Sequence, residues 1–232
     1  MKLMSFNTQH CMNYITKEID FDVMADAIEK FSPDVVGLQE MRGESSDAEY
    51  DEQVEILAKL TGMSYYRFGK AIDFEKGPYG NGILSKIPII SSEVIKIPDP
   101  NPRTGKRYYE TRAVLKVKLE GNVTVLVSHF GLNDDEKENA VKTVTEHIEN
   151  EKCIFMGDLN ALPDESVLLP IRERMKDAAE GFCEGLLSCP SDNPDKKIDY
   201  IFVSPDVEVL SSDIPDHIAS DHRPHIAEVC IK

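Results

Sequence analysis

The sequence contains no tryptophan and only five cysteines among its 232 residues, and these shortages exclude several classes of protein. The cysteines are odd in number, and no two of them form a Cys-x-x-Cys pair. This pattern argues against a disulfide framework and against a structural zinc site. Because free thiols are typical of a reducing compartment, we expect a cytoplasmic protein.

Long hydrophobic segments are also missing. No uncharged run of about 18 apolar residues occurs, so the sequence predicts no transmembrane helix. The segment from Met1 to Asn7 has no signature of a cleaved leader, and nothing suggests an amphipathic membrane anchor. Because no repeat, low-complexity tract or linker divides the chain, we expect a single domain over residues 1–232.

Positive charge is scarce, since 26 Lys and Arg stand against 42 Asp and Glu and the formal net charge is −16. Such a field repels polyanions on average, which argues against general nucleic-acid binding through a basic surface. It does not exclude a nuclease whose divalent ions and local cations neutralise the substrate. A small phosphoester agrees better with this charge, and no tryptophan is present to wedge against a base.

Helical and strand-like patterns alternate along the chain. Helices are expected at residues 21–31, 47–61, 134–150 and 164–174. Strands are expected at residues 2–7, 34–40, 65–68, 82–84, 87–97, 108–119, 123–129, 154–156, 198–203, 207–211 and 224–231. The first helix joins two strands as a βαβ-like unit, and Glu120-Gly121-Asn122 has the composition of a hairpin turn. These elements predict a layered α/β sandwich of packed sheets with outer helices.

The central segment of the chain is Cys153-Ile154-Phe155-Met156-Gly157-Asp158-Leu159-Asn160. A short apolar run predicts a buried strand that stops at Gly157. Asp158 and Asn160 follow two residues apart, so extended geometry places both side chains on the same side. A carboxylate acceptor beside an amide donor suits a phosphate whose attacking water must be held next to it. The same residue types are also typical of an ordinary polar turn.

Polar side chains stand at, or lead directly into, the ends of several predicted strands. They are Asn7, Glu40, His129, Asp158 with Asn160, and the segment Ser220-Asp221-His222-Arg223-Pro224. Asp199 lies inside another apolar strand, where a charged residue is uncommon unless it is paired. Because ligands of open α/β sheets gather where the strand-end loops meet, these groups predict a carboxylate-rich cleft.

Each of these residues, taken alone, is also compatible with a structural role. Only the full set, in this order along the chain, favours a catalytic site. The structural alternatives are a capping role for Asn7, a surface salt bridge between Glu40 and Arg42, a satisfied core position for His129, a solvated turn at Asp221-His222, and pairing of Asp199 with Lys196 or Lys197.

Seven short segments, in their order along the chain, resemble those of the endonuclease/exonuclease/phosphatase superfamily, a group of divalent-metal phosphoesterases. The resemblance covers essentially the whole chain, and its most specific parts are the Gly-Asp-x-Asn and Ser-Asp-His segments. It implies a four-layer α/β sandwich in which two packed mixed β-sheets are flanked by helices, as in deoxyribonuclease I. The matching segments are Ser5-Phe6-Asn7, Leu38-Gln39-Glu40, Gly80-Asn81-Gly82-Ile83-Leu84-Ser85-Lys86, Ser128-His129-Phe130, Gly157-Asp158-Leu159-Asn160, Ile198-Asp199-Tyr200-Ile201 and Ser220-Asp221-His222-Arg223-Pro224.

The resemblance also implies roles at the reacting phosphate. Asp158 would orient or deprotonate the attacking water, and Asn160 would donate a hydrogen bond to a phosphate oxygen. His222 would act at the phosphate as donor or base, with Asp199 fixing its tautomer. His129 matches the second histidine of the family, which contacts phosphate or assists the leaving group.

Metal ligands follow from the same resemblance. Glu40 would be the principal ligand of Mg²⁺ or Mn²⁺, assisted by Asn7 and Asp221, because these hard cations prefer oxygen donors. Asn81 and Arg112 match positions that often contact phosphate, although Arg112 is equally compatible with a structural salt bridge.

Substrate choice depends on the loops. The one cationic cluster, Arg103, Lys106 and Arg107, precedes Tyr108-Tyr109 and suits either a second phosphate and a stacked base or a solvated basic loop. We expect a metal-dependent hydrolase that acts on a small phosphodiester or phosphomonoester. The alternatives are a nuclease that acts on DNA or RNA and a catalytically silent binding module with the same fold.

Overall fold

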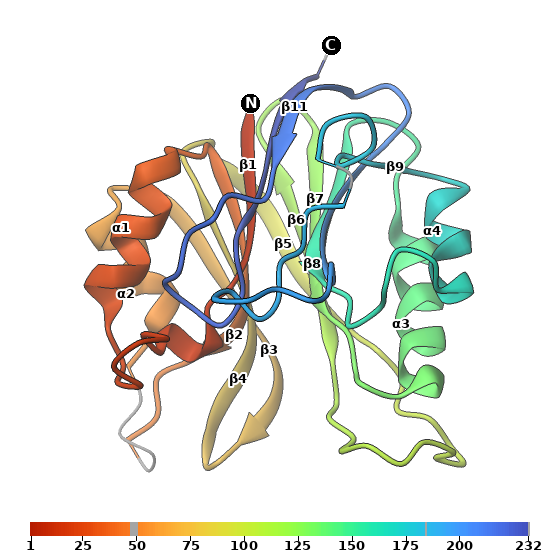
Figure 1. The fold of residues 1–232 in the computed structure, drawn as a ribbon, viewed down its shortest axis with the longest axis horizontal. Helices are drawn as coiled ribbons and strands as arrows, with labels where there is room; N and C mark the ends of the chain where they lie inside the picture. Colours follow the sequence, from red (N-terminus) through yellow and green to blue (C-terminus); the bar gives the residue numbers. More distant parts are fainter. Residues whose placement is uncertain (47–50, 184, 232) are drawn as a thin grey trace.

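Two six-stranded sheets lie face to face at the centre of the computed structural model, with helices on both outer sides (Figure 1). The structure describes residues 1–46, 51–183 and 185–231. From edge to edge, the first sheet consists of β11 (Glu208–Asp213), β12 (His225–Cys230), β1 (Lys2–Asn7), β2 (Val35–Arg42), β4 (Gly77–Ser85) and β3 (Tyr65–Phe74). The second sheet consists of β5 (Ile89–Lys96), β6 (Ala113–Leu119), β7 (Val123–His129), β8 (Cys153–Asp158), β10 (Asp199–Val203) and β9 (Lys176–Asp177).

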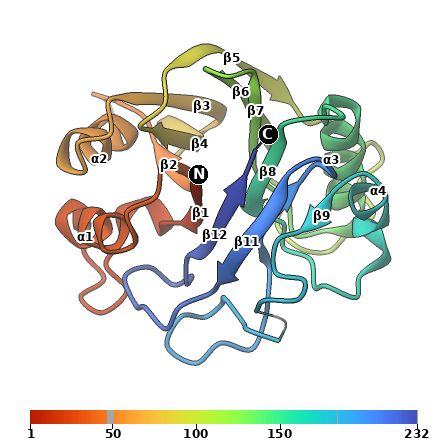
Figure 2. The ribbon, with the colours of Figure 1, turned by 90° about the horizontal axis from the view of Figure 1, so that it is seen from above.

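Both sheets are mixed, since β1 pairs with β2 and β7 pairs with β8 in parallel while the other named pairs are antiparallel. The helical elements are η1 (Gln9–Cys11), α1 (Phe21–Phe31), α2 (Gln53–Leu60), α3 (Asp134–His147), η2 (Ser166–Leu168) and α4 (Leu169–Arg172). Helices α1 and α2 cover the first sheet, and α3 and α4 cover the second (Figure 2). The predicted four-layer α/β sandwich is confirmed.

Apolar side chains fill each of the three spaces between the four layers. Leu3, Val35, Val127 and Met156 belong to the core between the two sheets. Met4, Phe6, Met24, Ile28 and Leu57 pack between the first sheet and its helices, and Leu126, Phe130, Val144, Phe155 and Ile171 pack between the second sheet and its helices. Because the central strands are buried on both faces, their sequences are nearly continuous apolar runs that end where the core ends.

The predicted strand over 108–119 is wrong in its first part, because β6 begins only at Ala113. Residues 107–110 are held by the N-terminal end of α3, and the Arg112 carbonyl bonds toward β5, where it accepts from the Ile97 N–H at 3.0 Å. The Arg107 backbone N–H donates to Asn133 Oδ1 at 2.8 Å, and the Glu110 N–H donates to Glu136 Oε1 at 3.1 Å. These side-chain acceptors satisfy the backbone groups that a sheet would otherwise use.

The hairpin between β3 and β4 is longer than the predicted strands at 65–68 and 82–84. Its turn residues Glu75 and Lys76 have φ values of 50° and 69°, a left-handed conformation that usually favours Gly or Asn. The sequence signal for this turn is therefore absent. By contrast, the predicted turn at Glu120-Gly121-Asn122 is confirmed, with φ values of 82° and 66° at its last two residues.

Helix ends also differ from the predictions. The helix expected at 47–61 is observed at Gln53–Leu60, and residues 47–50, which include the predicted apolar Tyr50, lie outside the described residues. The helix expected at 164–174 is divided into η2 and α4, where Pro170 lies in the first turn. No helix within the described ranges has the length and the apolar character that crossing a membrane requires.

A buried histidine on β12 makes the stability of the fold depend on pH. Burial and the nearby charge of Lys197 lower the pKa of His225 to about 4, whereas an unfolded histidine has a pKa of about 6.5. Between about pH 4 and 6.5 the unfolded state binds more protons than the folded state. The contribution of His225 to the unfolding free energy is therefore fully present above about pH 6.5 and is lost as the pH falls. We expect this residue to remove on the order of 3 kcal/mol of unfolding free energy between pH 7 and 4.

Urea unfolding at a series of pH values, with wild type beside His225→Gln, measures this contribution. The variant should show a shallower dependence of unfolding free energy on pH over that range. Equal slopes in the two proteins would contradict the assignment to His225.

Candidate active site

Three chemically active side chains are direct neighbours across the second sheet. Asp158 at the end of β8 pairs in register with His129 of β7 on one side and with Asp199 of β10 on the other. Residues in register point to the same face of a sheet, so these side chains gather in one row. Their separation in sequence is large, but the strand pairing brings them together without any loop rearrangement.

Gly157 permits this close approach of β7 and β8. A Cβ atom at Gly157 would lie 2.1 Å from the backbone oxygen of Ser128, which no side chain tolerates. Asn160 follows with a φ of 47°, and its backbone N–H donates to Asp158 Oδ1 at 3.0 Å. The Gly-Asp-x-Asn segment is therefore a strand end followed by a tight Asx-type turn. The polar turn that the sequence also suggested is present, and the same turn places Asp158 and Asn160 in the candidate site.

His222 connects the two aspartates of the row. Its Nδ1 lies 2.8 Å from Asp199 Oδ2, and its Nε2 lies 3.7 Å from Asp158 Oδ2. Because the Asp199 carboxylate is an acceptor, it holds the proton on Nδ1 and leaves Nε2 facing Asp158. The proposed pairing of Asp199 with Lys196 or Lys197 is wrong, since the Lys197 ammonium pairs with Asp177 at 3.1 Å.

Burial and charge act in opposite directions on this row. Burial by itself lowers the pKa of His222, but the negative charges of Asp199 and Asp158 outweigh it and raise that pKa well above the usual value. Burial raises the pKa of the Asp158 carboxyl, although His222 opposes the shift. The Asp158 carboxylate and the His222 imidazole therefore both have pKa values raised above their usual ones, which suits general acid–base chemistry.

The first sheet contributes Asn7 and Glu40 from the opposite side. The Asn7 amide donates to Glu40 Oε1 at 3.1 Å and to Asp158 Oδ2 at 3.0 Å, so it bridges the two sheets. Its Oδ1 also accepts from the Gln9 backbone N–H at 3.0 Å. Asn7 therefore also has the capping role that was the structural alternative in the sequence. Glu40 has a φ of 63° at a β-bulge between Leu38 and Met41, and a bulge redirects the side chain of its strand.

Glu40 does not form the salt bridge with Arg42 that the sequence suggested. The Arg42 guanidinium is buried against the rings of Phe74 and Tyr79 and pairs with Glu75 at 2.9 Å. The Glu40 carboxylate is therefore not paired with Arg42 and faces the candidate site, where its Oε1 lies 4.0 Å from His129 Nδ1.

His129 is a neutral donor in this arrangement. Its Nδ1 lies 3.0 Å from Arg112 Nη1, and because a guanidinium can only donate, Nδ1 must be the acceptor. The proton is then on Nε2, 3.4 Å from Asp158 Oδ2, and the Asn160 Nδ2 at 3.2 Å from Nε2 is a neighbouring donor that does not donate to it. Burial and the charges of Arg112 and His222 lower the pKa of His129 well below its usual value. The Asn160 amide donates to the Phe130 carbonyl beside it at 3.1 Å.

Arg112 and Asn81, the two predicted phosphate contacts, occupy different surroundings. Arg112 forms the structural salt bridge that the sequence left open, because it pairs with Glu110 at 2.7 Å, and it also contacts His129 at 3.0 Å. Its contact with phosphate stays a prediction. Asn81 on β4 is buried, and its amide donates to the Ala113 carbonyl at 2.9 Å. Within the described part of the chain its Oδ1 has no hydrogen-bond partner, so one polar atom of Asn81 is unsatisfied.

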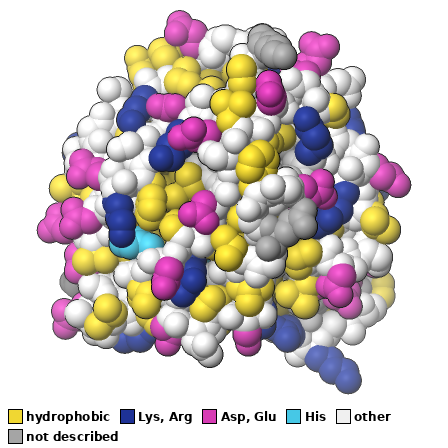
Figure 3. Space-filling view, turned by 45° about the horizontal axis from the view of Figure 1, so that its top comes forward, with side chains coloured by type: hydrophobic (Ala, Val, Ile, Leu, Met, Phe, Trp, Pro, Cys, Tyr) yellow, Lys and Arg dark blue, Asp and Glu magenta, His cyan; other side chains and the backbone are white. Residues whose placement is uncertain are grey.

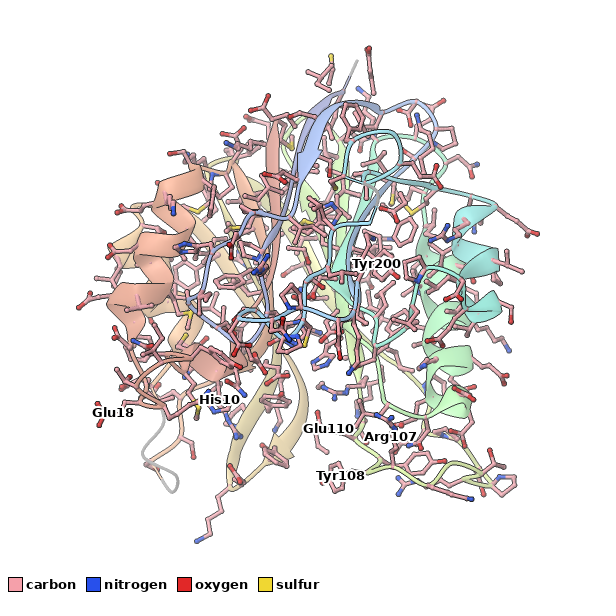
Figure 4. The ribbon with its side chains drawn as sticks, in the orientation of Figure 1. His10, Glu18, Arg107, Tyr108, Glu110 and Tyr200 are labelled. Carbon is pink, nitrogen blue, oxygen red and sulfur yellow. The ribbon has the colours of Figure 1, made fainter. Side chains whose placement is uncertain are left out.

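Sequence reasoning missed three residues of this site: His10, Tyr79 and Glu110. Tyr79 alternates with Asn81 on β4, and its hydroxyl interacts with Arg112 and with the charge of Glu40. Period-two alternation from Asn81 was the available signal for Tyr79. Figure 4 places His10 on the side of the first sheet and Glu110 on the side of the second.

The donor set agrees with a hard divalent cation. Glu40 and Asp221 supply carboxylates, and the charge of Glu40 acts on Asp221. Asn7 lies beside Glu40 but turns its Nδ2 toward it, so its amide oxygen would have to rotate away from Gln9 to join the ligands. Asp158, Asp199 and His222 also have donor atoms within 4.8 Å of one another, but the hydrogen bond between His222 and Asp199 already engages two of them. The carboxylates outside that row are therefore the better metal ligands.

The loop with the cationic cluster is firmly attached. Arg103 stacks over the ring of Tyr109 at 4.7 Å, and the Tyr109 hydroxyl donates to Asp135 Oδ2 at 2.7 Å, so both residues serve the structure of the loop. Tyr108 is 66% exposed and lies with Arg107 on the side of the loop that faces the β3–β4 hairpin (Figure 4). Lys106, Arg107 and Tyr108 are exposed and remain the groups of this loop that are free to contact a substrate.

The surface carries no broad basic area on the face shown in Figure 3. Acidic and basic side chains alternate there with hydrophobic ones. Interspersed charges of both signs give little attraction for a long polyanion, in agreement with the net charge of −16.

Comparison with solved structures establishes the fold. An endonuclease/exonuclease/phosphatase from Beutenbergia cavernae superposes with a TM-score of 0.82 at 20% identity, over 100% of this chain and 71% of that one. A Bacteroides thetaiotaomicron mannosyl-6-phosphatase gives a TM-score of 0.78 at 15% identity, over 100% of both chains. The catalytic domain of human nocturnin with a bound sulfate gives 0.71 at 16% identity, over 100% of this chain and 94% of that one.

A search of curated protein sequences finds no match. The model of the endonuclease/exonuclease/phosphatase family, in contrast, matches residues 4–222, a range that includes every predicted site residue. The match runs from β1 to His222, and the two-sheet architecture is the one that the similar structures share. The chain therefore belongs to the endonuclease/exonuclease/phosphatase family.

Proposed function

We propose that this protein is a divalent-metal-dependent phosphoesterase that hydrolyses a small phosphodiester or phosphomonoester by in-line attack of water. The observation that carries the proposal is the position of Asp158. It lies between His222, which is bound to Asp199, and Asn7, which is bound to Glu40. One buried carboxylate thus contacts both the acid–base row and the side chains that suit a metal.

Asp158 is the proposed base. Its raised pKa increases its capacity to accept a proton from water near neutral pH, and Asn7 fixes its orientation. His222 holds a proton at Nδ1 against Asp199 and presents Nε2 to the same space. Because both groups are buried, the proton stays between them instead of exchanging freely with solvent.

The phosphate would lie against the donors on the other side of Asp158. The Asn160 amide, the Nε2–H of His129 and the Arg112 guanidinium gather there, and all three carry N–H groups. Donors fixed before the substrate arrives stabilise the negative charge that builds on phosphate oxygens in the transition state. Glu110 keeps the Arg112 side chain in place through their ion pair.

Glu40, Asn7 and Asp221 would hold the cation. When bound, Mg²⁺ or Mn²⁺ supplies Lewis-acid stabilisation to phosphoryl oxygens. Glu40→Gln keeps the size of the side chain but removes its charge, so we expect the metal concentration for half-maximal activity to rise on the order of 10-fold or more. Metal titration of the hydrolysis rate measures this shift.

A control for Glu40→Gln is Glu138→Gln on α3, an exposed carboxylate of the opposite outer layer. The control should titrate like wild type. If Glu40→Gln did the same, Glu40 would not be a ligand.

A substrate panel tests the proposed function. Wild type and Asp158→Asn would be assayed with Mg²⁺ or Mn²⁺ and with EDTA on bis-p-nitrophenyl phosphate, sugar phosphates, inositol phosphates, RNA and plasmid DNA. Hydrolysis of a small phosphoester by wild type only, abolished by EDTA, supports the proposal. Absence of activity on every substrate would count against an enzyme and favour a binding module of this fold.

A nuclease is the second candidate, and the exposed pair Tyr108 and Arg107 favours it. An aromatic ring beside a guanidinium can stack a base and contact its phosphate. Plasmid nicking or RNA cleavage by wild type, without turnover of small phosphoesters, would replace the small-substrate proposal with this one. The net charge of −16 opposes it, because a polyanion gains little from the rest of the surface.

A further inference from the structure

One imidazole of the site has no part in the proposed chemistry. His10 Nδ1 lies 4.0 Å from Glu40 Oε2, on the side of Glu40 that faces away from Asn7 and His129. The His10 side chain is 26% exposed, so small solutes can reach it from solvent. The charges of Glu40 and Asp221 both act on it, as do those of Arg42 and Glu75.

The turn that carries His10 is conformationally costly. Gln9, His10 and Cys11 have φ values of 47°, 47° and 61°, three successive residues in the left-handed region without a glycine among them. Each such residue costs on the order of 1 kcal/mol or more, so the surrounding structure must hold the turn in place. The Met12 N–H donates to the Gln9 carbonyl at 2.9 Å, and Cys11 is completely buried beneath the turn.

Two further contacts attach the turn to the strand of Glu40. The Thr8 hydroxyl and N–H both donate to the Gln39 carbonyl, one residue before Glu40. The buried Gln53 side chain of α2 donates to the His10 carbonyl at 2.8 Å and accepts from the Arg42 N–H at 2.9 Å. The backbone at His10 and the bulge at Glu40 are therefore fixed relative to each other by the same side chain.

We propose that His10 is a ligand of the divalent cation, through Nδ1, and that it shares the cation with Glu40. This proposal rests on the metal dependence of the proposed function. Two donors of one six-coordinate cation, each about 2.1 to 2.2 Å away, lie about 3 Å apart when adjacent and about 4.3 Å apart when opposite. The observed 4.0 Å between His10 Nδ1 and Glu40 Oε2 lies between these two values and nearer the second, so a small side-chain shift would seat a cation between the two groups.

A nitrogen ligand changes which metal the site prefers. Mg²⁺ binds oxygen donors and keeps its waters, whereas imidazole suits first-row transition metals. With His10 in the coordination sphere, the site should bind Mn²⁺ or Co²⁺ in preference to Mg²⁺. A site built from Glu40, Asn7 and Asp221 alone would have only the preferences of oxygen donors.

Metal binding by the catalytically inactive Asp158→Asn protein tests the proposal without reference to turnover. Mn²⁺ and Mg²⁺ would be titrated calorimetrically into this protein and into versions that also carry His10→Asn, Glu40→Gln or His147→Ala. Asparagine tolerates the left-handed conformation of position 10, so His10→Asn should fold normally. His147→Ala is the matched control, because it removes an imidazole from the distant α3.

His10→Asn should weaken Mn²⁺ binding on the order of 10-fold or more while changing Mg²⁺ binding much less. Pulsed EPR of bound Mn²⁺ should show a directly coordinated ¹⁴N that disappears in this variant and persists in His147→Ala. Unchanged Mn²⁺ affinity, or a ¹⁴N signal that survives His10→Asn, would overturn the role of His10 even if Glu40→Gln abolishes binding. Failure of the parent protein to bind either metal would overturn both this proposal and the proposed metal dependence.

Discussion

Asp158→Asn should reduce the rate of phosphoester hydrolysis on the order of 10³- to 10⁴-fold, which is the upper part of the range for a lost general base. The substitution keeps the size of the side chain but removes its ability to accept a proton from water. Steady-state turnover on the best substrate of the panel measures the effect. The loss should appear in kcat, because the carboxylate acts on the water and not on the bound phosphate.

The same variant should keep the native fold. Asparagine has the size of the buried aspartate and keeps one acceptor oxygen, while the desolvated charge of Asp158 and its attraction to His222 are lost together. Thermal unfolding would therefore separate loss of catalysis from loss of structure. Asp26→Asn, an exposed aspartate of α1, is the matched control and should retain full activity. Turnover close to wild type in Asp158→Asn would remove Asp158 from the mechanism.

His222→Ala should reduce kcat on the order of 10²- to 10⁴-fold, since it removes the imidazole that connects Asp199 with Asp158. The variant also leaves Asp199 buried without its partner, so a modest loss of stability is expected. Turnover and thermal unfolding would be measured on the same preparation.

A second variant separates the two effects of His222→Ala. His222→Gln retains a hydrogen-bond donor for Asp199, so it should recover stability while remaining almost inactive. His217→Ala is the matched control, because its ring contacts Lys30 and Phe31 outside the site. If His222→Gln regained most of the activity, the role of His222 would be structural and not proton transfer.

The strand-end residues could be predicted because burial marks each strand in the sequence. The run Ile154 to Met156 ends at Gly157, and the polar side chains that follow must leave the apolar core. Once β7, β8 and β10 align, His129, Asp158 and Asp199 become neighbours as a consequence of register. The sequence pattern therefore predicts both which residues form the site and that they lie at the same edge of the sheet.

The turn at His10 and the bulge at Glu40 could not be predicted, because non-glycine residues adopt the left-handed conformation there. The turn at Gln9, His10 and Cys11 contains no Gly or Asn, so nothing in the sequence indicates that His10 faces Glu40. The β-bulge that redirects the Glu40 side chain also has no signal in the sequence. Tertiary hydrogen bonds, such as those of Gln53, fix these conformations against local preference.

The pairing of charges was also not predictable from neighbours along the chain. The sequence suggested Glu40 with Arg42 and Asp199 with Lys196 or Lys197, which are the shortest connections. The fold instead pairs Arg42 with Glu75 and Asp199 with His222. The partners are instead side chains far apart in sequence that the fold brings together in charge-assisted hydrogen bonds, and in the Asp199–His222 pair both groups are buried.

The most direct test of the account is hydrolysis of bis-p-nitrophenyl phosphate by wild type and Asp158→Asn, first with Mn²⁺ and then after addition of EDTA. We predict turnover by wild type that EDTA stops and that fresh Mn²⁺ restores, with the variant slower on the order of 10³-fold. Equal turnover by the two proteins, or wild-type turnover that EDTA leaves unchanged, would contradict a metal-dependent site organised around Asp158.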